Sequence, residues 1–174
     1  MRKLAVCIAV AAVCCLASVQ AAEYYTKHSG DKRRAEPEEG MALVYVFRPT
    51  TMAYGVKTWT FADDQLIGLS KPKGYYFAQV PPGKRLIWSK AENTSALEVE
   101  LEAGETYYFK TGIRVGLGKA RVKLEQVTAE QTEKFFQKCS YTEPTEDGRQ
   151  RAAEIAANRK ERAEENAAKK AAKK

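Results

Sequence analysis

The stretch YFAQVPPGKRLIWSK, residues 76–90, places Pro-Pro-Gly at residues 81–83 between two runs of aromatic and branched side chains. Runs of this composition, bounded by proline and glycine, are typical of β-strands. A proline cannot donate to a strand ladder, a second proline presets the first position of a turn, and glycine tolerates a positive φ angle. The stretch therefore predicts a corner that joins two strands, Tyr75–Val80 and Arg85–Lys90.

Similar short runs, each bounded by turn residues, occupy the sequence on both sides of this corner. The segments between them are too short for the crossover helices that a parallel sheet requires. We therefore expect an all-β fold, an antiparallel sandwich or barrel of about 7–8 strands. The predicted strands are Met41–Arg48, Lys57–Ala62, Gln65–Leu69, Tyr75–Val80, Arg85–Lys90, Ser95–Glu102, Thr106–Thr111 and Ala120–Val127.

Two of these strands show a strict alternation. In ALEVELE, residues 96–102, leucine and valine alternate with three glutamates, and in ARVKLEQV, residues 120–127, valine and leucine alternate with arginine and lysine. Strand side chains point to opposite faces in turn, so each strand has one buried and one solvated face. Same-face neighbours stand ~7 Å apart. We therefore interpret the glutamates as part of a polar outer face with cross-strand ion pairs rather than as a calcium or acid–base site.

One short helix follows the last predicted strand. The pattern predicts it over Ala129–Lys138, with Thr128 as N-cap and Gln131 reaching back in a capping box. We expect Phe135 and Phe136 on this helix to cover an open end of the sandwich.

The chain begins with the features of a signal peptide. Arg2 and Lys3 precede an apolar run, Leu4–Ala17, which is too short to remain as a membrane-spanning helix. Small residues then predict cleavage after Ala21, so residues 1–21 form the leader. No second long apolar segment follows, and the processed chain is expected to have no transmembrane segment and to be periplasmic or secreted.

The cysteines suggest one alternative to simple cleavage. A lipoprotein anchored at Cys14 is the interpretation that we favour less, because the residues before it fit the lipoprotein pattern poorly. Cleavage removes three cysteines and leaves Cys139, which cannot form an internal disulfide. We interpret Cys139 as a half-buried thiol, with an intermolecular disulfide as the alternative.

The regions on either side of the predicted domain, residues 41–139, are polar. Residues 22–40 have mixed charge and no apolar period, which predicts a flexible linker. Residues 140–174 form a tail of alanine and charged residues, helical or disordered, with Ile155 as its large aliphatic residue and no stripe to bury. We favour a solvated tail; the alternative is that the terminal KKAAKK makes a weak contact with an anionic membrane.

The net charge of +7 is a clue to the class of partner. In an exported protein, anionic lipid headgroups, cell-wall polymers or an acidic protein fit this charge better than nucleic acid does. We therefore expect an unknown envelope protein or cell-wall polymer as the partner, and no nucleic acid.

Several motifs that resemble active sites fail in detail. The single histidine, His28, falls in the predicted linker and, with one remaining cysteine, cannot supply a catalytic histidine–nucleophile pair or a zinc site. The glycine-rich segment Gly112–Ala120 departs from a phosphate-binding loop and predicts a flexible hairpin connection. We expect no cofactor, no metal site and no catalytic residue.

Asp63 and Asp64 lie between two apolar runs, and we expect them to cap a tight turn. An enzyme that uses these aspartates as an unrecognised carboxylate site is a remaining alternative.

The aromatic residues are the most plausible contacts in the sequence. Adjacent tyrosines in a strand point to opposite faces, so one of each pair must be exposed or covered by another element. We favour coverage by loops and the helix; exposed rings would instead stack on a sugar or bind a protein. The candidate partner contacts are Tyr75, Tyr76, Lys84, Arg85, Trp88 and Tyr108.

Four segments in order carry a resemblance: ALVYVFRP, FADDQLIGLSKPKGYYFAQVPPGKRLI, LEAGETYYFKTG and ARVKLEQV. Together they resemble a family of exported bacterial domains called domain of unknown function 2846, over roughly residues 40–139. The middle segment is also similar to PEGA and carboxypeptidase-regulatory-like domains, with Gln65 where their hairpin usually has glycine. The resemblance implies a prealbumin-like or immunoglobulin-like β-sandwich at the cell envelope, often lipidated, and no known reaction.

The sequence therefore predicts a non-enzymatic envelope domain that binds a protein or cell-wall partner. The alternatives are a carbohydrate-binding module, with Tyr75, Tyr76, Tyr108 or Trp88 as stacking rings, and the carboxylate enzyme mentioned above.

Overall fold

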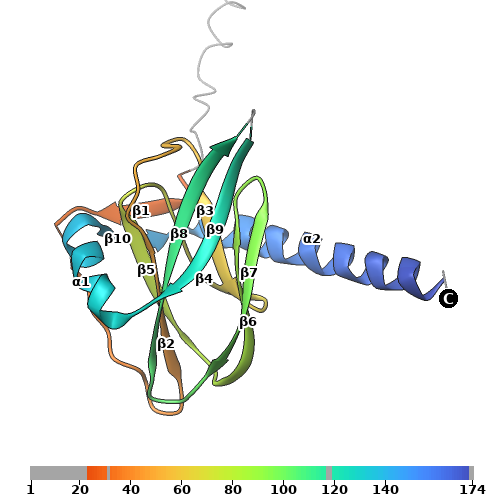
Figure 1. Cartoon of the computed structure of the whole chain (residues 1–174), viewed down its shortest axis with the longest axis horizontal. Coiled ribbons are helices and arrows are strands. Elements are labelled where there is room, and N and C mark those ends of the chain that lie inside the picture. The colour runs from red at the N-terminus through yellow and green to blue at the C-terminus, as the bar shows by residue number, and fades with distance from the viewer. Residues whose placement is uncertain (1–22, 31, 117–118, 173–174) are drawn as a thin grey trace, which may run out of the picture.

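Two β-sheets pack face to face in the computed structural model, which describes residues 23–30, 32–116 and 119–172 (Figure 1). In spatial order, the six-stranded sheet contains β1 (Tyr25–His28), β10 (Ser140–Pro144), β5 (Gly74–Val80), β2 (Ala42–Arg48), β8 (Thr106–Gly116) and β9 (Lys119–Val127). The four-stranded sheet contains β4 (Gln65–Ser70), β3 (Thr58–Ala62), β6 (Gly83–Lys90) and β7 (Thr94–Leu101). The expected β-sandwich is confirmed.

The eight predicted strands are all present, with two differences in detail. Two pairings, β2 with β8 and β10 with β5, are parallel rather than antiparallel. A parallel pair needs a long crossover, and between β2 and β8 the chain builds the whole four-stranded sheet. In addition, β8 continues to Gly116 and β9 begins at Lys119, so most of the expected flexible connection at residues 112–120 is strand.

The Pro-Pro-Gly corner carries the chain from one sheet to the other. β5 ends at Val80 in the six-stranded sheet and β6 begins at Gly83 in the four-stranded sheet. Gly83 has a φ of +106°, a conformation that side chains with a Cβ rarely adopt. The corner predicted from residues 81–83 is therefore confirmed, and its function is to fold one sheet onto the other.

β2 lies at the centre of the core and is buried along its whole length. Val44 and Val46 face the other sheet and pack with Ile87 and Leu101, while Tyr45 and its same-face neighbours belong to a second cluster on the outer side. The sequence of a strand that is covered on both faces is a continuous apolar run, and ALVYVF is such a run. Each such side chain contributes roughly 1.5–3 kcal/mol by burial.

Helix α1 (Ala129–Lys138) covers the outer face of the six-stranded sheet, not an open end of the sandwich as expected. The ring of Phe136 lies edge-on against Phe47 and Tyr75, with centroids 4.9 and 5.2 Å apart. The helix has the predicted bounds, and the Gln131 side chain accepts a hydrogen bond from the Thr128 N–H at 3.3 Å. Aromatic residues on the outer face of the sheet explain why the helix lies there.

The segment expected to be a flexible linker is bound to the body. Residues 25–28 form β1 and pair with β10. Further along, Tyr75 donates to the carbonyl of Arg33 at 2.7 Å, and the Ala35 N–H donates to Tyr45 at 2.6 Å. These buried tyrosine hydroxyls need polar partners, and residues 33–35 supply them.

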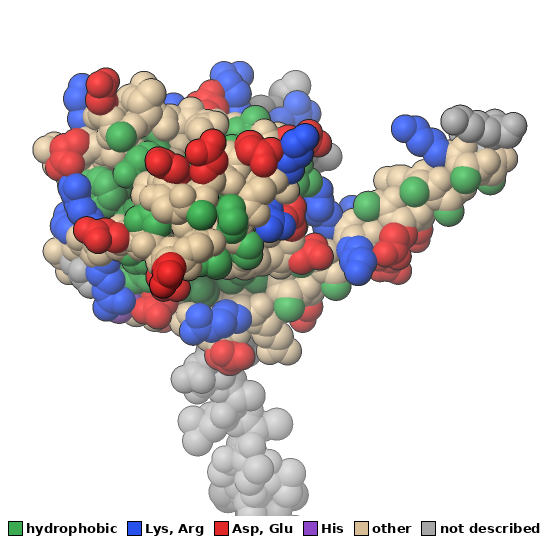
Figure 2. All heavy atoms as spheres, turned by 90° about the horizontal axis from the view of Figure 1, so that it is seen from below, with side chains coloured by type: hydrophobic (Ala, Val, Ile, Leu, Met, Phe, Trp, Pro, Cys, Tyr) green, Lys and Arg blue, Asp and Glu red, His purple; other side chains and the backbone are tan. Residues whose placement is uncertain are grey.

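The tail also differs from the prediction. Ser140–Pro144 form β10, and helix α2 (Glu146–Ala171) packs its first half on the outer face of the four-stranded sheet, where Ala152 and Ile155 contact Phe61 and Trp88. The second half stands clear of the body, with acidic and basic side chains along it (Figure 2). Small alanine side chains can pack against flat aromatic rings without a wide apolar stripe along the helix. The sequence pattern therefore did not predict this packing.

Within the described ranges, no helix is long and apolar enough to cross a membrane. The predicted leader, its cleavage site and Cys14 lie outside the described residues.

Candidate functional site

Three of the aromatic residues proposed as contacts belong to the protein interior. Tyr75, Tyr76 and Trp88 are no more than 1% exposed. The Tyr76 hydroxyl lies 2.7 Å from Thr60 Oγ1, and burial raises the pKa of Tyr76 to about 12. Tyr75 packs against Phe136 of α1, Tyr76 lies between the sheets and Trp88 packs against Ala152 of α2, so these rings are not available to a sugar or a partner.

The other three candidates do not come together in one site. Lys84 is exposed, and Tyr108 is half-buried with its ring stacked on Tyr45, centroids 5.7 Å apart. The guanidinium of Arg85 donates to the carbonyls of Pro81 and Pro82, so its function is to hold the corner.

Asp63 forms part of a turn, as expected. It has a φ of 50°, and its carboxylate accepts from the Leu86 N–H at 3.0 Å and from Arg85 at 3.2 Å. Asp64 is exposed and lines an open groove of about 420 Å³ together with Arg149 and mostly apolar residues. No second carboxylate is among the residues that line this groove, so Asp64 has no acid–base partner there.

Cys139 and His28 are the residues that the sequence offers for catalysis or metal binding, and the structure does not bring these two residues together. Cys139 is fully buried rather than half-buried, and burial raises the pKa of its thiol to about 11. His28 lies on β1, with Nε2 3.5 Å from Glu143. In the described part of the chain, no three His, Cys, Asp or Glu side chains are placed to hold a metal ion.

The structure instead points to the loop of residues 49–57, which links β2 to β3 and so crosses between the sheets. Among the described residues, the large hydrophobic side chains that stand exposed are Met52, at 55%, and Tyr54, at 73%. One exposed apolar residue on a surface is ordinary. Two on one loop, two positions apart, form a local apolar projection.

A buried arginine determines the shape of this loop. Arg48, the last residue of β2, is 0% exposed, and its guanidinium donates to the carbonyls of Val56 at 2.5 Å, Ala53 at 3.0 Å and Met52 at 3.2 Å. Removing a charge from water is costly unless hydrogen bonds compensate it. The three bonds give loop carbonyls a donor and offset part of the cost of burying the cation, so Met52 and Tyr54 are presented by an ordered loop.

A backbone hydrogen bond and apolar packing also hold the loop in place. Ala53 has a φ of 55°, and the Val56 N–H donates to its carbonyl at 3.0 Å. Ala53 and Val56 pack against Ile113 and Val122 of the β8–β9 hairpin. A non-glycine residue in the left-handed region carries strain that the surrounding structure must offset, and such residues gather at binding loops.

Two tyrosines and two lysines surround the projection. The Lys57 ammonium lies 4.0 Å from the centre of the Tyr24 ring, and the Lys71 ammonium lies 6.0 Å from that of Tyr25. Burial, then the neighbouring Tyr54, raises the pKa of Tyr25, while burial and then Lys71 lower the pKa of Lys57. Lys57 ends the loop and contacts Tyr24, and the adjacent Tyr25 contacts Lys71, so these four residues continue from the base of the loop. We call this set the end platform: Tyr24, Tyr25, Met52, Tyr54, Lys57 and Lys71.

Sequence reasoning missed the end platform because it searched the strands. The loop sequence PTTMAYGVK contains Met52 and Tyr54 between turn residues, and an apolar pair inside a predicted loop is the signal that could have found it. No pattern indicates that Arg48 is buried, since arginine at a strand end is usually solvated.

The comparisons with known proteins place part of the chain in a family and name no activity. The model of a family described as "Protein of unknown function (DUF2846)" matches residues 38–123. An uncharacterized protein of Haemophilus influenzae is 27% identical over 108 residues, which cover 62% of this chain and 64% of that protein. The chain therefore spans less than two thirds of this relative. No solved structure matches the chain significantly.

Proposed function

We propose that this protein is a non-enzymatic binding domain of the cell envelope that holds a partner protein on its end platform. The DUF2846 family, whose model matches residues 38–123, is described without an activity, so the proposal rests on the surface of the molecule. The observation that carries the proposal is the ordered presentation of Met52 and Tyr54 by the buried Arg48. Methionine, tyrosine and arginine are enriched in protein interfaces.

An ordered loop favours binding of a partner protein. A loop that is already held in its bound shape loses less conformational entropy on association than a mobile loop does. Tyr54 offers a large ring with few rotatable bonds, and Lys57 and Lys71 form a cationic rim. An apolar centre with a charged rim is the usual anatomy of a protein interface, and the lysines favour a partner with acidic groups.

The proposed location rests on the leader. Arg2 and Lys3 followed by the apolar run Leu4–Ala17 support export. N-terminal sequencing of the protein from cell fractions tests this part, because export with cleavage predicts a periplasmic chain that begins at Ala22.

A double substitution tests the binding function. The purified protein and a Met52→Ser/Tyr54→Ser variant are each used to capture proteins from detergent-solubilised envelopes, with quantification by mass spectrometry. The partner should be enriched by the unchanged protein and at least about tenfold less by the variant, since central interface residues often contribute 2 kcal/mol or more. Both side chains are exposed, so the fold should be unaffected.

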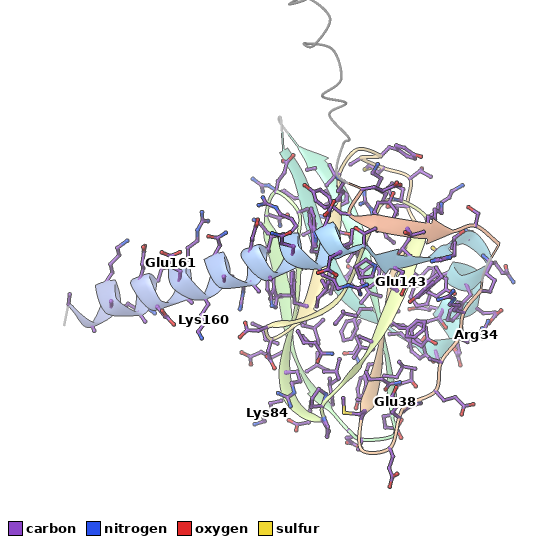
Figure 3. All side chains as sticks on the ribbon, turned by 180° about the vertical axis from the view of Figure 1, so that it is seen from behind. Arg34, Glu38, Lys84, Glu143, Lys160 and Glu161 are labelled. Carbon is purple, nitrogen blue, oxygen red and sulfur yellow. The ribbon has the colours of Figure 1, made fainter. Side chains whose placement is uncertain are left out.

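Lys84→Gln is the matched control, because Lys84 is exposed at the opposite end of the sandwich (Figure 3). It should capture the partner as the unchanged protein does. Equal capture by the double variant, or loss of capture in Lys84→Gln alone, would contradict the assignment of the end platform.

Carbohydrate binding is a second candidate function, with Tyr54 as the stacking ring in place of the rings that the sequence suggested. Tyr54 is 73% exposed and could stack on a sugar ring, whereas the buried Tyr75, Tyr76 and Trp88 could not. Calorimetric titration with soluble peptidoglycan fragments separates the two candidates: heat that disappears in Tyr54→Ser favours the sugar, and no heat favours the protein.

A further inference from the structure

A groove of about 320 Å³ lies between α2 and the outer face of the four-stranded sheet, and no end-platform residue is among those that line it. Four cations line it: Lys90 from β6 and Arg151, Arg159 and Arg162 from α2. The polar side chains of Thr94 and Asn158 also line it, and no carboxylate is among its lining residues. Arg151 is paired with Glu154, and the other three cations repel each other unless an anion lies between them.

Three neighbouring carboxylates are engaged with other partners than Lys90, Arg159 and Arg162. Glu154 pairs with Arg151 at 2.5 Å, and Glu165 pairs with Lys169 at 3.4 Å. On the sheet side, the Glu92 carboxylate accepts the Ala120 N–H at 2.7 Å. Among the described residues, neither Arg159 nor Arg162 forms an ion pair.

The floor of the groove is rigid. The Trp88 N–H donates to the Asp63 carbonyl at 2.7 Å, and the Trp88 ring stacks on Phe61 with centroids 4.2 Å apart. The Arg159 guanidinium lies 4.7 Å from the centre of a Trp88 ring. Stacking on an aromatic face limits the motion of Arg159 while leaving its N–H groups available for an anion.

We propose that this groove binds an oxyanion of the phosphate class, held by Arg159 and Arg162 of α2 and by Lys90 of β6. Arginine forks match the oxygens of phosphate, and hydrogen bonds between charged groups are stronger than neutral ones. Thr94 and Asn158 add neutral donors. A bound oxyanion joins the helix to the sheet where α2 begins to leave the body, so binding also stabilises the packing of α2.

Trp88 reports directly on occupancy. In a Trp59→Phe protein, Trp88 is the remaining tryptophan, because the chain has two. Its fluorescence is followed during titration with sodium tripolyphosphate, and separately with vesicles of phosphatidylglycerol and of phosphatidylcholine. We expect a saturable change that weakens as salt is added.

Substitutions in α2 identify the site. Arg162→Gln should weaken tripolyphosphate binding about tenfold or more, because it removes charge-assisted hydrogen bonds. Lys169→Gln, further along the same helix, should bind as the unchanged protein does. A response to tripolyphosphate alone indicates a soluble phosphate ligand, and a response to phosphatidylglycerol but not phosphatidylcholine vesicles indicates a lipid headgroup.

Either of those responses supports the proposal if it weakens in Arg162→Gln. No saturable change with any probe, or equal affinity in Arg162→Gln and the unchanged protein, overturns it. The result is independent of the end platform, because Met52→Ser/Tyr54→Ser leaves the groove intact.

Discussion

Arg48 has an unusual position for an arginine, since it is fully buried and donates to backbone carbonyls of the 49–57 loop. Burial lowers the pKa of Arg48, but an arginine remains charged at any physiological pH. A hydrophobic residue would pack here without the cost of burying a charge. The loop explains why a charged residue lies here, because the guanidinium of Arg48 is a hydrogen-bond donor to the backbone carbonyls of the loop.

Arg48→Met should destabilise the protein by about 2–3 kcal/mol, because it removes the guanidinium hydrogen bonds to three loop carbonyls. Urea denaturation measures this change. The loop should also become mobile, and limited trypsin digestion should then cut after Lys57 faster than in the unchanged protein.

Arg121→Met is the control, because Arg121 is an exposed arginine on β9. It should change the free energy of unfolding by less than about 0.5 kcal/mol. A similar, small effect of both substitutions would show that Arg48 is not what holds the loop.

Strands and helices differed in how well the sequence predicted them. The eight predicted strands and α1 are each specified by a local apolar pattern, so they were found within a few residues. β1 and β10 have four and five residues, no alternation, and a pairing between distant segments. Only tertiary structure brings Tyr25 opposite Pro144, so no local pattern could predict that pair.

The start of α2 depends on a close approach at Gly148. A Cβ atom at this position would lie 1.9 Å from the carbonyl oxygen of Tyr24, which also accepts the Thr145 N–H at 3.1 Å. Gly148→Ala should therefore push α2 away from the N-terminal segment, with a loss of about 1–3 kcal/mol in the free energy of unfolding.

Gly112→Ala is the matched substitution, because a Cβ atom there would meet nothing within 4 Å and the φ of Gly112 is not in the left-handed region. It should be neutral or slightly stabilising. Thermal or urea unfolding of both variants compares them; a neutral Gly148→Ala would mean that α2 does not dock as described.

The β8–β9 ladder contains the clearest pH-sensitive group. Glu125 accepts from Lys123 at 2.5 Å and from Lys110 at 3.0 Å, and these bonds lower its pKa to about 2. An unfolded glutamate titrates near ~4.3. The ion pairs therefore stabilise the fold above that pH, and the contribution is lost as pH falls toward about 2.

Glu125→Gln should remove this part of the acid dependence, measured as the free energy of unfolding between pH 6 and 2. Because the side chain is 36% exposed, solvent screening limits the effect to ~1 kcal/mol or less. Glu100→Gln, on the exposed face of β7 and outside the described ion pairs, is the control. An identical pH profile for Glu125→Gln and the unchanged protein would contradict the ion-pair assignment.

In the assembled molecule, the coverage of both sheets decides where a partner can bind. α1 and residues 33–35 cover the aromatic cluster on one outer face, and the first half of α2 covers Phe61 and Trp88 on the other. This coverage buries Tyr75 and Trp88, while Tyr76 lies between the two sheets. The end platform and the groove beside α2 are left as surfaces with exposed binding groups, and each lies where a loop or helix meets the sandwich.

The assignment of the end platform is tested most directly by a photo-crosslinking amino acid placed in living cells at position 54 or, as the control, at position 84. We predict a discrete crosslinked species from position 54 that Arg48→Met weakens, and none from position 84, which lies at the opposite end of the sandwich (Figure 3). No crosslink from position 54, or the same products from both positions, would contradict a partner-binding function of the 49–57 loop.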